Sequence, residues 1–168
     1  MIRLSRPDDR DAIVALILGI QNGEFNLNLT LTEQADLLDI AAHYFADGGG
    51  FWVATTQGGE IVGSIGLMKK SGRCAVLKKF FLKPEFRGKA SGYAAALFNA
   101  VVAFAKGQGI AQIILDTPSV AVRSHRFYRS VGFQLIDPAQ LPISYAYPDR
   151  DSLLFCLDLR PPFGAAPP

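Results

Sequence analysis

The segment "KPEFRGKASGYA", residues 83–94, places a basic, glycine-containing loop directly before an alanine-rich helix. Glycine lets the backbone adopt left-handed conformations and approach a ligand closely. The first turn of a helix leaves N–H groups unpaired and carries a partial positive charge, which suits a phosphate. The basic side chains of this region are Lys78, Lys79, Lys83, Arg87 and Lys89. The segment predicts a site for a ligand with several phosphates, with a plain turn and solvated lysines as the alternative interpretation.

Tightly connected strands are predicted before the loop. The runs with strand-like composition are residues 51–57, 60–70 and 73–82. Gly58-Gly59 separates the first two runs and Ser71-Gly72 separates the second two. Connections this short predict an antiparallel meander, because they leave no room for a crossover.

A helix and a parallel strand are predicted after the loop. Leu97, Val101 and Phe104 share one face of the helix. Residues 110–117 then form an apolar strand, and a return of this length predicts that it runs parallel to residues 73–82. The remaining predicted elements are a strand at 2–4, helices beginning near residues 7 and 32 (the second continuing to 46), a helix at 119–131, and strands near 133–136 and 152–159.

The order of these elements is β-α-α-β-β-β-α-β-α-β-β. It predicts an α/β (α+β) fold with a mixed, mostly antiparallel twisted sheet of about seven strands and four helices. The chain contains no internal repeat and no linker that would divide it. Residues 1–160 are therefore predicted to form a single domain, and the segment "PPFGAAPP", residues 161–168, a flexible tail.

Composition limits the function classes. The chain has 168 residues, of which 49% are hydrophobic and 19% charged, so it is predicted to be globular. A net charge of +2 gives no argument for a nucleic-acid partner. The apolar run at 12–20 is too short to span a bilayer, so no membrane association and a cytoplasmic location are expected. Cys74 and Cys156 fit two buried thiols, and no metal-binding spacing is visible.

Two common nucleotide motifs are absent from the sequence. The loop lacks the G-x-x-x-x-G-K-[ST] pattern of a P-loop. It also lacks G-x-G-x-x-G, and a meander is the wrong context for a dinucleotide-binding unit. Binding of ATP or of a nucleic-acid phosphate is nevertheless kept as a rival interpretation of the basic loop.

A second segment, "SHRFYRSVGF" at residues 124–133, favours the interpretation of the loop as a ligand site over that of a plain turn. Together with the loop and the element order, it makes the chain resemble the GNAT superfamily of acyl-CoA-dependent N-acetyltransferases. The family's loop pattern, [QR]-x-x-G-x-[GA], corresponds here to residues 87–92. Its later "FY…GF"-like segment corresponds to Phe127-Tyr128 and Gly132-Phe133. The resemblance in element order covers nearly the whole chain.

The resemblance implies acetyl-CoA as co-substrate and assigns residues to it. The backbone of Phe80, Phe81 and Leu82 would run beside the pantetheine arm like an added strand. The implied pyrophosphate site consists of Arg87, Gly88, Lys89, Ala90, Ser91, Gly92 and Tyr93. Two positions depart from the family pattern. Ala90 replaces the usual middle glycine, and Ala121 stands where many relatives have an asparagine that contacts the cofactor.

The resemblance also implies the reaction, a direct transfer of the acetyl group to a primary amine. Tyr128 would stand near the thioester sulfur and act as the general acid, because a buried hydroxyl can donate a proton while uncharged. Val76 and lysines occupy the strand where many relatives carry a basic carboxylate. The resemblance instead implies two candidates for the base: Asp116, twelve residues before Tyr128, where some relatives carry a catalytic glutamate, and Glu24, in a segment that borders the acceptor cleft in the family. A turn or helix-capping role is the alternative for Asp116. No covalent nucleophile and no metal are expected.

The acceptor is predicted only as a small-molecule amine. Glu24, Asp36 and Asp39 could form an acidic lip for a cationic amine, or equally a solvated helix face. A non-catalytic acyl-CoA-binding or interaction domain on the same fold is the alternative function. A homodimer is common in the family and is one assembly open to this chain.

Overall fold

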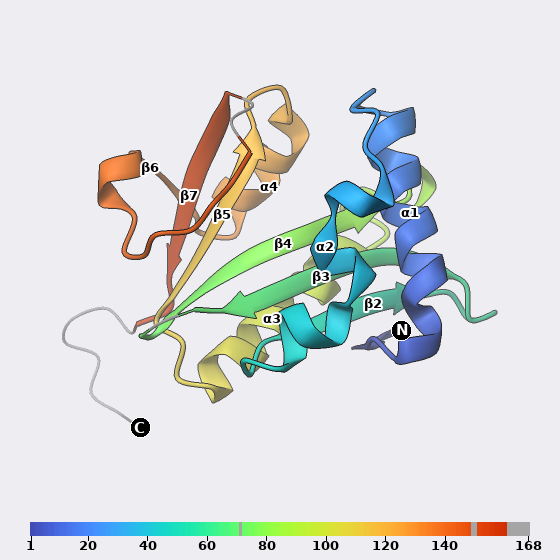
Figure 1. Cartoon of the computed structure of the whole chain (residues 1–168), viewed down its shortest axis with the longest axis horizontal. Coiled ribbons are helices and arrows are strands. Elements are labelled where there is room, and N and C mark those ends of the chain that lie inside the picture. Colours follow the sequence, from blue (N-terminus) through green and yellow to red (C-terminus); the bar gives the residue numbers. More distant parts are fainter. Residues whose placement is uncertain (71, 149–150, 161–168) are drawn as a thin grey trace. The chain divides into compact units, whose positions relative to one another are not determined.

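The computed structural model describes residues 1–70, 72–148 and 151–160 (Figure 1). The bounds of its main elements are β1 (Ile2–Leu4), α1 (Arg10–Gly23), α2 (Ala35–Leu38), β2 (Gly50–Thr55), β3 (Ile61–Lys69), β4 (Cys74–Leu82), α3 (Tyr93–Gly107), β5 (Gln112–Pro118), α4 (Val122–Ser130), β6 (Gln134–Ile136) and β7 (Ser152–Asp158). Short helical turns accompany them: η1 (Pro7–Asp9), η2 (Leu31–Glu33), η3 (Ala41–Phe45), η4 (Pro84–Phe86) and η5 (Pro138–Gln140). The predicted tail, residues 161–168, lies outside the described residues.

The strand order confirms the predicted fold class. The strands follow one another as β1-β2-β3-β4-β5-β7-β6 in a seven-stranded sheet. The pairs β1–β2, β2–β3, β5–β7 and β6–β7 are antiparallel, and β4 pairs with β5 in parallel as the short crossover through α3 requires. The α/β (α+β) fold with a mixed, mostly antiparallel sheet is therefore confirmed.

The chain divides into two compact units. Unit 1 comprises Met1–Lys69 and Leu77–Phe104, and unit 2 comprises Lys70–Val76 and the chain from Ala105 onward. The strand β4 contributes residues to both units. That residues 1–160 form a single domain stays a prediction.

Unit 1 contains the antiparallel strands that precede the loop. Val53 of β2 pairs with Arg3 on one side and with Ser64 of β3 on the other. The β2–β3 connection turns at Gly59, whose φ is +86°, and Gly59 N–H donates to the Thr56 carbonyl at 3.1 Å. The predicted hairpin therefore exists, with a connection longer than the two glycines alone.

Helices cover both faces of these strands in unit 1. α1 and α2 lie in front of β2–β4 in Figure 1, and α3 runs behind them. The front core comprises Ile13, Leu16, Ile17, Ile20, Leu37, Tyr44, Phe51, Val53, Ile61 and Met68. Tyr44 meets Phe51 edge to face, with ring centroids 4.9 Å apart. Behind the strands, Trp52 packs edge to face against Phe104 of α3 at 5.1 Å. The alternation along β2 therefore fills two cores.

The prediction of one continuous helix over residues 32–46 is wrong. The chain forms η2, α2 and η3 instead, because the backbone leaves helical geometry at Gln34 (ψ 72°) and Asp39 (ψ 85°). The carboxylate of Asp39 accepts a hydrogen bond from the Ala42 N–H at 2.9 Å. A short acidic side chain competes in this way with the helical hydrogen bonds. One helical segment therefore ends before Asp39 and another begins after it.

Unit 2 is built on β5. Cys74, at the start of β4, pairs in parallel with Gln112, and Asp116 of β5 pairs antiparallel with Leu154 of β7. Ile113, Ile114 and Leu115 are fully or almost fully buried along this strand. Asp116 directly follows this buried run and is itself half-buried, which places a carboxylate beside the buried part of the strand.

Candidate active site

The loop of residues 87–92 has the geometry of an anion seat. It connects η4 to the first residue of α3, Tyr93. Gly88 and Gly92 adopt φ values of +100° and +71°, a region that disfavours other residues. Gly88, Lys89 and Ala90 are exposed residues. Exposed N–H groups at the beginning of a helix are suited to phosphate oxygens.

The loop is held by its own polar groups. The Ser91 hydroxyl lies 2.6 Å from the Phe86 carbonyl and 2.9 Å from the Gly88 carbonyl, and can donate to either. The Phe86 and Tyr93 rings pack edge to face, with centroids 5.7 Å apart. Ala90 is not among the described residues with a positive φ. Its backbone conformation therefore does not require the glycine that the family pattern has there.

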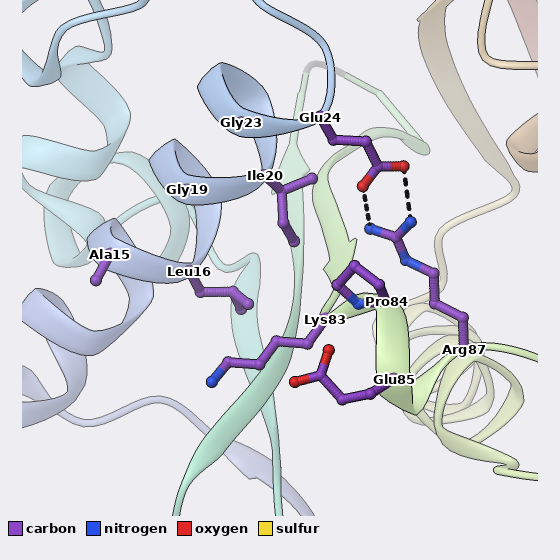
Figure 2. A pocket seen from close by; sticks show the side chains of 10 residues that line it. All are labelled: Ala15, Leu16, Gly19, Ile20, Gly23, Glu24, Lys83, Pro84, Glu85 and Arg87. Atoms are coloured by element: carbon purple, nitrogen blue, oxygen red, sulfur yellow. Dashed lines mark hydrogen bonds and ion pairs between the residues drawn. The ribbon is translucent and has the colours of Figure 1, made fainter.

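Arg87 forms an ion pair with Glu24, the C-cap residue of α1. Its Nη1 and Nη2 atoms donate to the two carboxylate oxygens of Glu24, each at 2.7 Å. Its Nε donates to the Leu82 carbonyl at 2.8 Å. Figure 2 shows this ion pair beside an open pocket of about 660 Å³. The pocket is lined by Ala15, Leu16, Gly19, Ile20, Gly23, Glu24, Lys83, Pro84, Glu85 and Arg87.

The strand before the loop is interrupted at Lys79. This residue has φ of +54°, which regular extended backbone does not allow, so β4 is distorted just before Phe80, Phe81 and Leu82. Its Nζ donates to the Gln34 side chain at 2.5 Å and lies 3.3 Å from an Asp36 oxygen. The distortion is therefore fixed by polar contacts to the helical segment around α2.

The proposed acidic lip is largely neutralised. Asp36 is paired with Lys79 and accepts a hydrogen bond from the Tyr44 hydroxyl at 2.7 Å. Asp39 caps the N–H of Ala42, and Glu24 is paired with Arg87. These three carboxylates therefore have partners within the protein, which weakens the case for a polycationic acceptor.

In unit 2, the charge of Asp116 affects the pKa of the buried Tyr128. Tyr128 lies on α4 with 7% of its surface exposed, packed against the rings of Phe133 and Phe155. Burial, and then the negative charge of Asp116, raise the pKa of Tyr128 above its usual value. The hydroxyl is therefore protonated throughout the physiological pH range, as a general acid must be.

Tyr145 joins Asp116 from a long connection that the sequence does not mark. Its hydroxyl donates to Asp116 Oδ1 at 3.3 Å, and its ring packs against Tyr147 at 5.4 Å. Burial, and then Asp116, raise the pKa of Tyr145 as well. The sequence signal was only the pair of tyrosines in "YAYP", residues 145–148, between the last two strands.

The capping alternative for Asp116 is wrong. Asp116 lies within β5, whereas the N-cap of α4 is Ala121, which makes no side-chain capping bond. His125 is buried and its Nε2 lies 3.0 Å from the Pro118 carbonyl, so this ring packs within unit 2. Unit 1 thus brings Glu24 to the loop, and unit 2 brings Asp116 to Tyr128.

Other site types find no support in the described part of the chain. Burial raises the pKa of the Cys74 thiol to about 11, so this thiol is a poor nucleophile near neutral pH. Within residues 1–70, 72–148 and 151–160, no group of His, Cys, Asp or Glu is arranged to hold a metal ion. Over the same residues, every helix is too short or too polar to cross a membrane.

Comparison with known proteins agrees with these features. Residues 17–133 match the model of the Acetyltransferase (GNAT) family. The solved structure of an acetyltransferase from Streptococcus agalactiae 2603 has a TM-score of 0.88 and 36% sequence identity, covering 95% of this chain and 98% of that one. The predicted family is therefore confirmed.

Two curated relatives are similar to part of this chain. N-acetyltransferase 8B from Rattus norvegicus is 35% identical over 104 residues, which is 59% of this chain and 46% of the relative. N-acetylaspartate synthetase from Danio rerio is 34% identical over 103 residues, which is 60% of this chain and 36% of the relative. The chain spans less than half the length of either curated relative.

Proposed function

We propose, from the premise that the chain belongs to the acetyltransferase (GNAT) family, that it moves the acetyl group of acetyl-CoA directly to the primary amine of a small molecule. The observation that carries this proposal is the loop of residues 87–92. Its two left-handed glycines lie ahead of α3, and its exposed residues Gly88, Lys89 and Ala90 lie where a pyrophosphate would bind.

The proposed cofactor site consists of β4 and the loop. The backbone of Phe80, Phe81 and Leu82 would pair with the pantetheine arm, since an extended ligand can add to an open strand. The pyrophosphate would accept hydrogen bonds from the backbone of residues 88–93. The departure at Ala90 is compatible with this role, because its φ is not left-handed.

The chemistry makes three demands on the protein. The amine nitrogen attacks the thioester carbon and forms a C–N bond, the carbonyl oxygen becomes an oxyanion, and the C–S bond then breaks. A free alkylamine has a pKa near that of lysine, about 10.4, so it must lose a proton before it attacks. The departing thiolate must gain a proton. A backbone N–H near the end of β4 is the proposed donor to the oxyanion.

Tyr128 is the proposed general acid. Its hydroxyl would give its proton to the departing sulfur and would recover it from solvent or from the amine. Burial and Asp116 hold its pKa above the usual range, which keeps the hydroxyl protonated before the transfer. Its helix position is fixed by ring contacts to Phe133 and Phe155.

Asp116 is the proposed base, acting through a water molecule. Its carboxylate interacts with both Tyr128 and Tyr145, so it stands among the groups whose protonation the reaction needs. Glu24 is the second candidate, but both of its oxygens accept bonds from Arg87. That pairing favours Asp116 over Glu24 as the group that takes the amine proton.

A small acceptor is proposed on two grounds. The name of the Danio rerio relative, N-acetylaspartate synthetase, is that of an enzyme with a small product. In addition, Glu24 is paired with Arg87 and Asp36 with Lys79, while Asp39 accepts a backbone hydrogen bond, so two of the three carboxylates have a cationic partner that offsets their charge for a polyamine. An amine with a single positive charge fits this balance better.

The cellular setting is proposed from the cysteines. Cys74 and Cys156 are free thiols, which suits a reducing compartment such as the cytoplasm. Acetyl-CoA and the amine are the proposed partners. A homodimer, and the absence of nucleic-acid and membrane partners, stay predictions.

Release of CoA thiol in the presence of acetyl-CoA and a panel of primary amines tests this function. We expect release with at least one small amine and none with desulfo-CoA, which lacks the thioester. Saturable acetyl-CoA binding without release for any amine would instead support the alternative, a non-catalytic acyl-CoA-binding domain.

A further inference from the structure

The guanidinium of Arg87 is committed to partners within the protein. It forms an end-on bidentate pair with Glu24, both bonds being 2.7 Å, and a third bond of 2.8 Å to the Leu82 carbonyl. Its side chain is 18% exposed, against 39% for Glu24. A bidentate arginine–carboxylate pair is directional and strong for its class. An anionic ligand could use this guanidinium only by displacing the carboxylate.

The charge of Arg87 is also largely cancelled for an approaching anion. The two oxygens of the Glu24 carboxylate accept hydrogen bonds from Nη1 and Nη2 of the guanidinium, so the pair carries almost no net charge at the loop. The attraction of a pyrophosphate to Arg87 itself is therefore small. The N–H groups of the exposed residues Gly88, Lys89 and Ala90 are the better candidates for direct contact.

The two ends of the ion pair belong to different parts of unit 1. Glu24 is the C-cap of α1, while Arg87 directly precedes the left-handed Gly88. The Asn22 side chain, in the last turn of α1, forms two hydrogen bonds with the backbone of Leu29, which lies beyond Glu24, at 2.8 and 2.7 Å. The segment between α1 and η2 is thus itself ordered, so it can serve as an anchor for the loop.

The pocket explains why this anchor matters. The part of α1 that lines it carries Ala15, Leu16, Gly19 and Ile20, none of which has a polar side chain that could pair with residues 83–87. In Figure 2, the side chains of Glu24 and Arg87 point toward one another at the end of α1, beside this pocket. The ion pair is therefore a bridge between α1 and the beginning of the loop.

From these contacts we infer that Arg87 is a positioning residue of the cofactor loop, acting through Glu24, and not a ligand of the phosphates. This inference rests on the proposed function, because it concerns how the loop is held for acetyl-CoA. It gives Glu24 a role in cofactor affinity that is separate from proton transfer. It also links the cofactor loop to the end of α1.

The two roles of Arg87 predict opposite effects of changing Glu24. If Arg87 bound phosphate, Glu24→Gln would free the guanidinium, remove a negative charge and tighten acetyl-CoA binding. If Arg87 positions the loop, Glu24→Gln and Arg87→Gln should each weaken binding by roughly fivefold to tenfold, and the double variant should be no weaker than either single one. The charge-reversed variant Glu24→Arg/Arg87→Glu should recover affinity to within about threefold of wild type.

Calorimetric titration of these variants of the 168-residue chain with acetyl-CoA, without any amine, makes the test. Glu60→Gln is the matched control, because Glu60 forms an ion pair with Lys83 beside the loop but does not join α1 to it. Thermal unfolding confirms that each variant is folded. Tighter binding by Glu24→Gln, or failure of the charge-reversed variant to recover, would overturn the inference alone. Absence of binding by the wild type would overturn the proposed function and this inference with it.

Discussion

The cofactor loop, residues 87–92, and the tyrosine cluster, which consists of Tyr128, Tyr145 and Asp116, differ in the exposure of their polar groups. The loop has exposed residues at Gly88, Lys89 and Ala90, and the charged side chain at its beginning, Arg87, is paired with Glu24. The cluster buries the hydroxyl of Tyr128 and places a carboxylate, Asp116, beside it. Exposed N–H groups can exchange water for phosphate oxygens at little cost, whereas a buried hydroxyl keeps its proton.

This contrast separates two tasks that a sequence alone does not distinguish. Binding a multiply charged ligand here depends on backbone geometry, so it should respond to changes of conformation. Proton transfer depends on one functional group and its burial, so it should respond to removal of a single oxygen atom. Substitutions in the two regions should therefore change different measured quantities.

The largest effect is expected for Tyr128→Phe. The change removes the proposed proton donor while keeping the ring contacts to Phe133 and Phe155. Turnover with an accepted amine should fall by roughly 100-fold or more, the contribution typical of a general acid. Affinity for acetyl-CoA should stay within about twofold by calorimetry, because the loop is untouched.

Tyr147→Phe is the control for this substitution, because it removes the hydroxyl of another tyrosine in unit 2, whose ring packs against Tyr145. It should leave turnover within a factor of about three, in contrast to the loss for a catalytic acid. Equal turnover by the Tyr128→Phe variant and the wild type would show that Tyr128 only packs α4.

A smaller effect, confined to binding, is expected for Gly88→Ala. A Cβ at Gly88 would meet no atom within 4 Å, so any effect comes from its φ of +100° and not from a clash. Left-handed backbone costs an alanine roughly 1–2 kcal/mol, which corresponds to about a tenfold loss of acetyl-CoA affinity if binding needs this conformation.

Ala90→Gly is the matched change in the same loop. Because Ala90 is not left-handed, a glycine there should alter the affinity by no more than about threefold. Both dissociation constants come from titration calorimetry. If Ala90→Gly strengthened binding more than Gly88→Ala weakened it, the middle position would be the one that limits the loop.

The smallest effect concerns stability at high pH. An unfolded tyrosine has a pKa of about 10, and burial and Asp116 raise the pKa of Tyr128 and Tyr145 in the folded chain. Their contribution to stability is therefore fully present below pH 10 and is lost as pH rises above it. Each should lower the free energy of unfolding by about 1.4 kcal/mol per pH unit above that point.

Urea unfolding at a series of pH values from 8 to about 11 measures this loss. The decline should be steeper for the wild type than for Tyr128→Phe, because the variant cannot release that proton. Tyr147→Phe again serves as the control for removal of a tyrosine from the same region. Parallel declines in all three proteins would mean that Tyr128 ionises as readily in the folded chain as in the unfolded one.

The sequence predicted the features that depend on local chemistry. The order of the elements along the chain, the parallel return to β5 and the glycine loop follow from hydrophobic period, connection length and the conformational freedom of Gly88 and Gly92. Tyr128 was found through the family pattern around residues 124–133. These signals lie within a few residues of the features they indicate.

Features that depend on distant contacts were missed. Tyr145 meets Asp116 from 29 residues away, and nothing near it in the sequence indicates that contact. The left-handed Lys79 is held by Gln34 and Asp36, which belong to another segment. Likewise, the pairing of Glu24 with Arg87 joins residues 63 positions apart. The break at Asp39 is local, but the apolar pattern over residues 32–46 concealed it.

Titration of the purified wild-type protein with acetyl-CoA tests the central claim most directly, with ATP and desulfo-CoA as comparison ligands. Saturable binding of acetyl-CoA and desulfo-CoA with little response to ATP is the predicted result, because the loop would then recognise the CoA pyrophosphate together with its pantetheine arm. Absence of acetyl-CoA binding at high ligand concentration, or equally tight binding of ATP, would contradict the account.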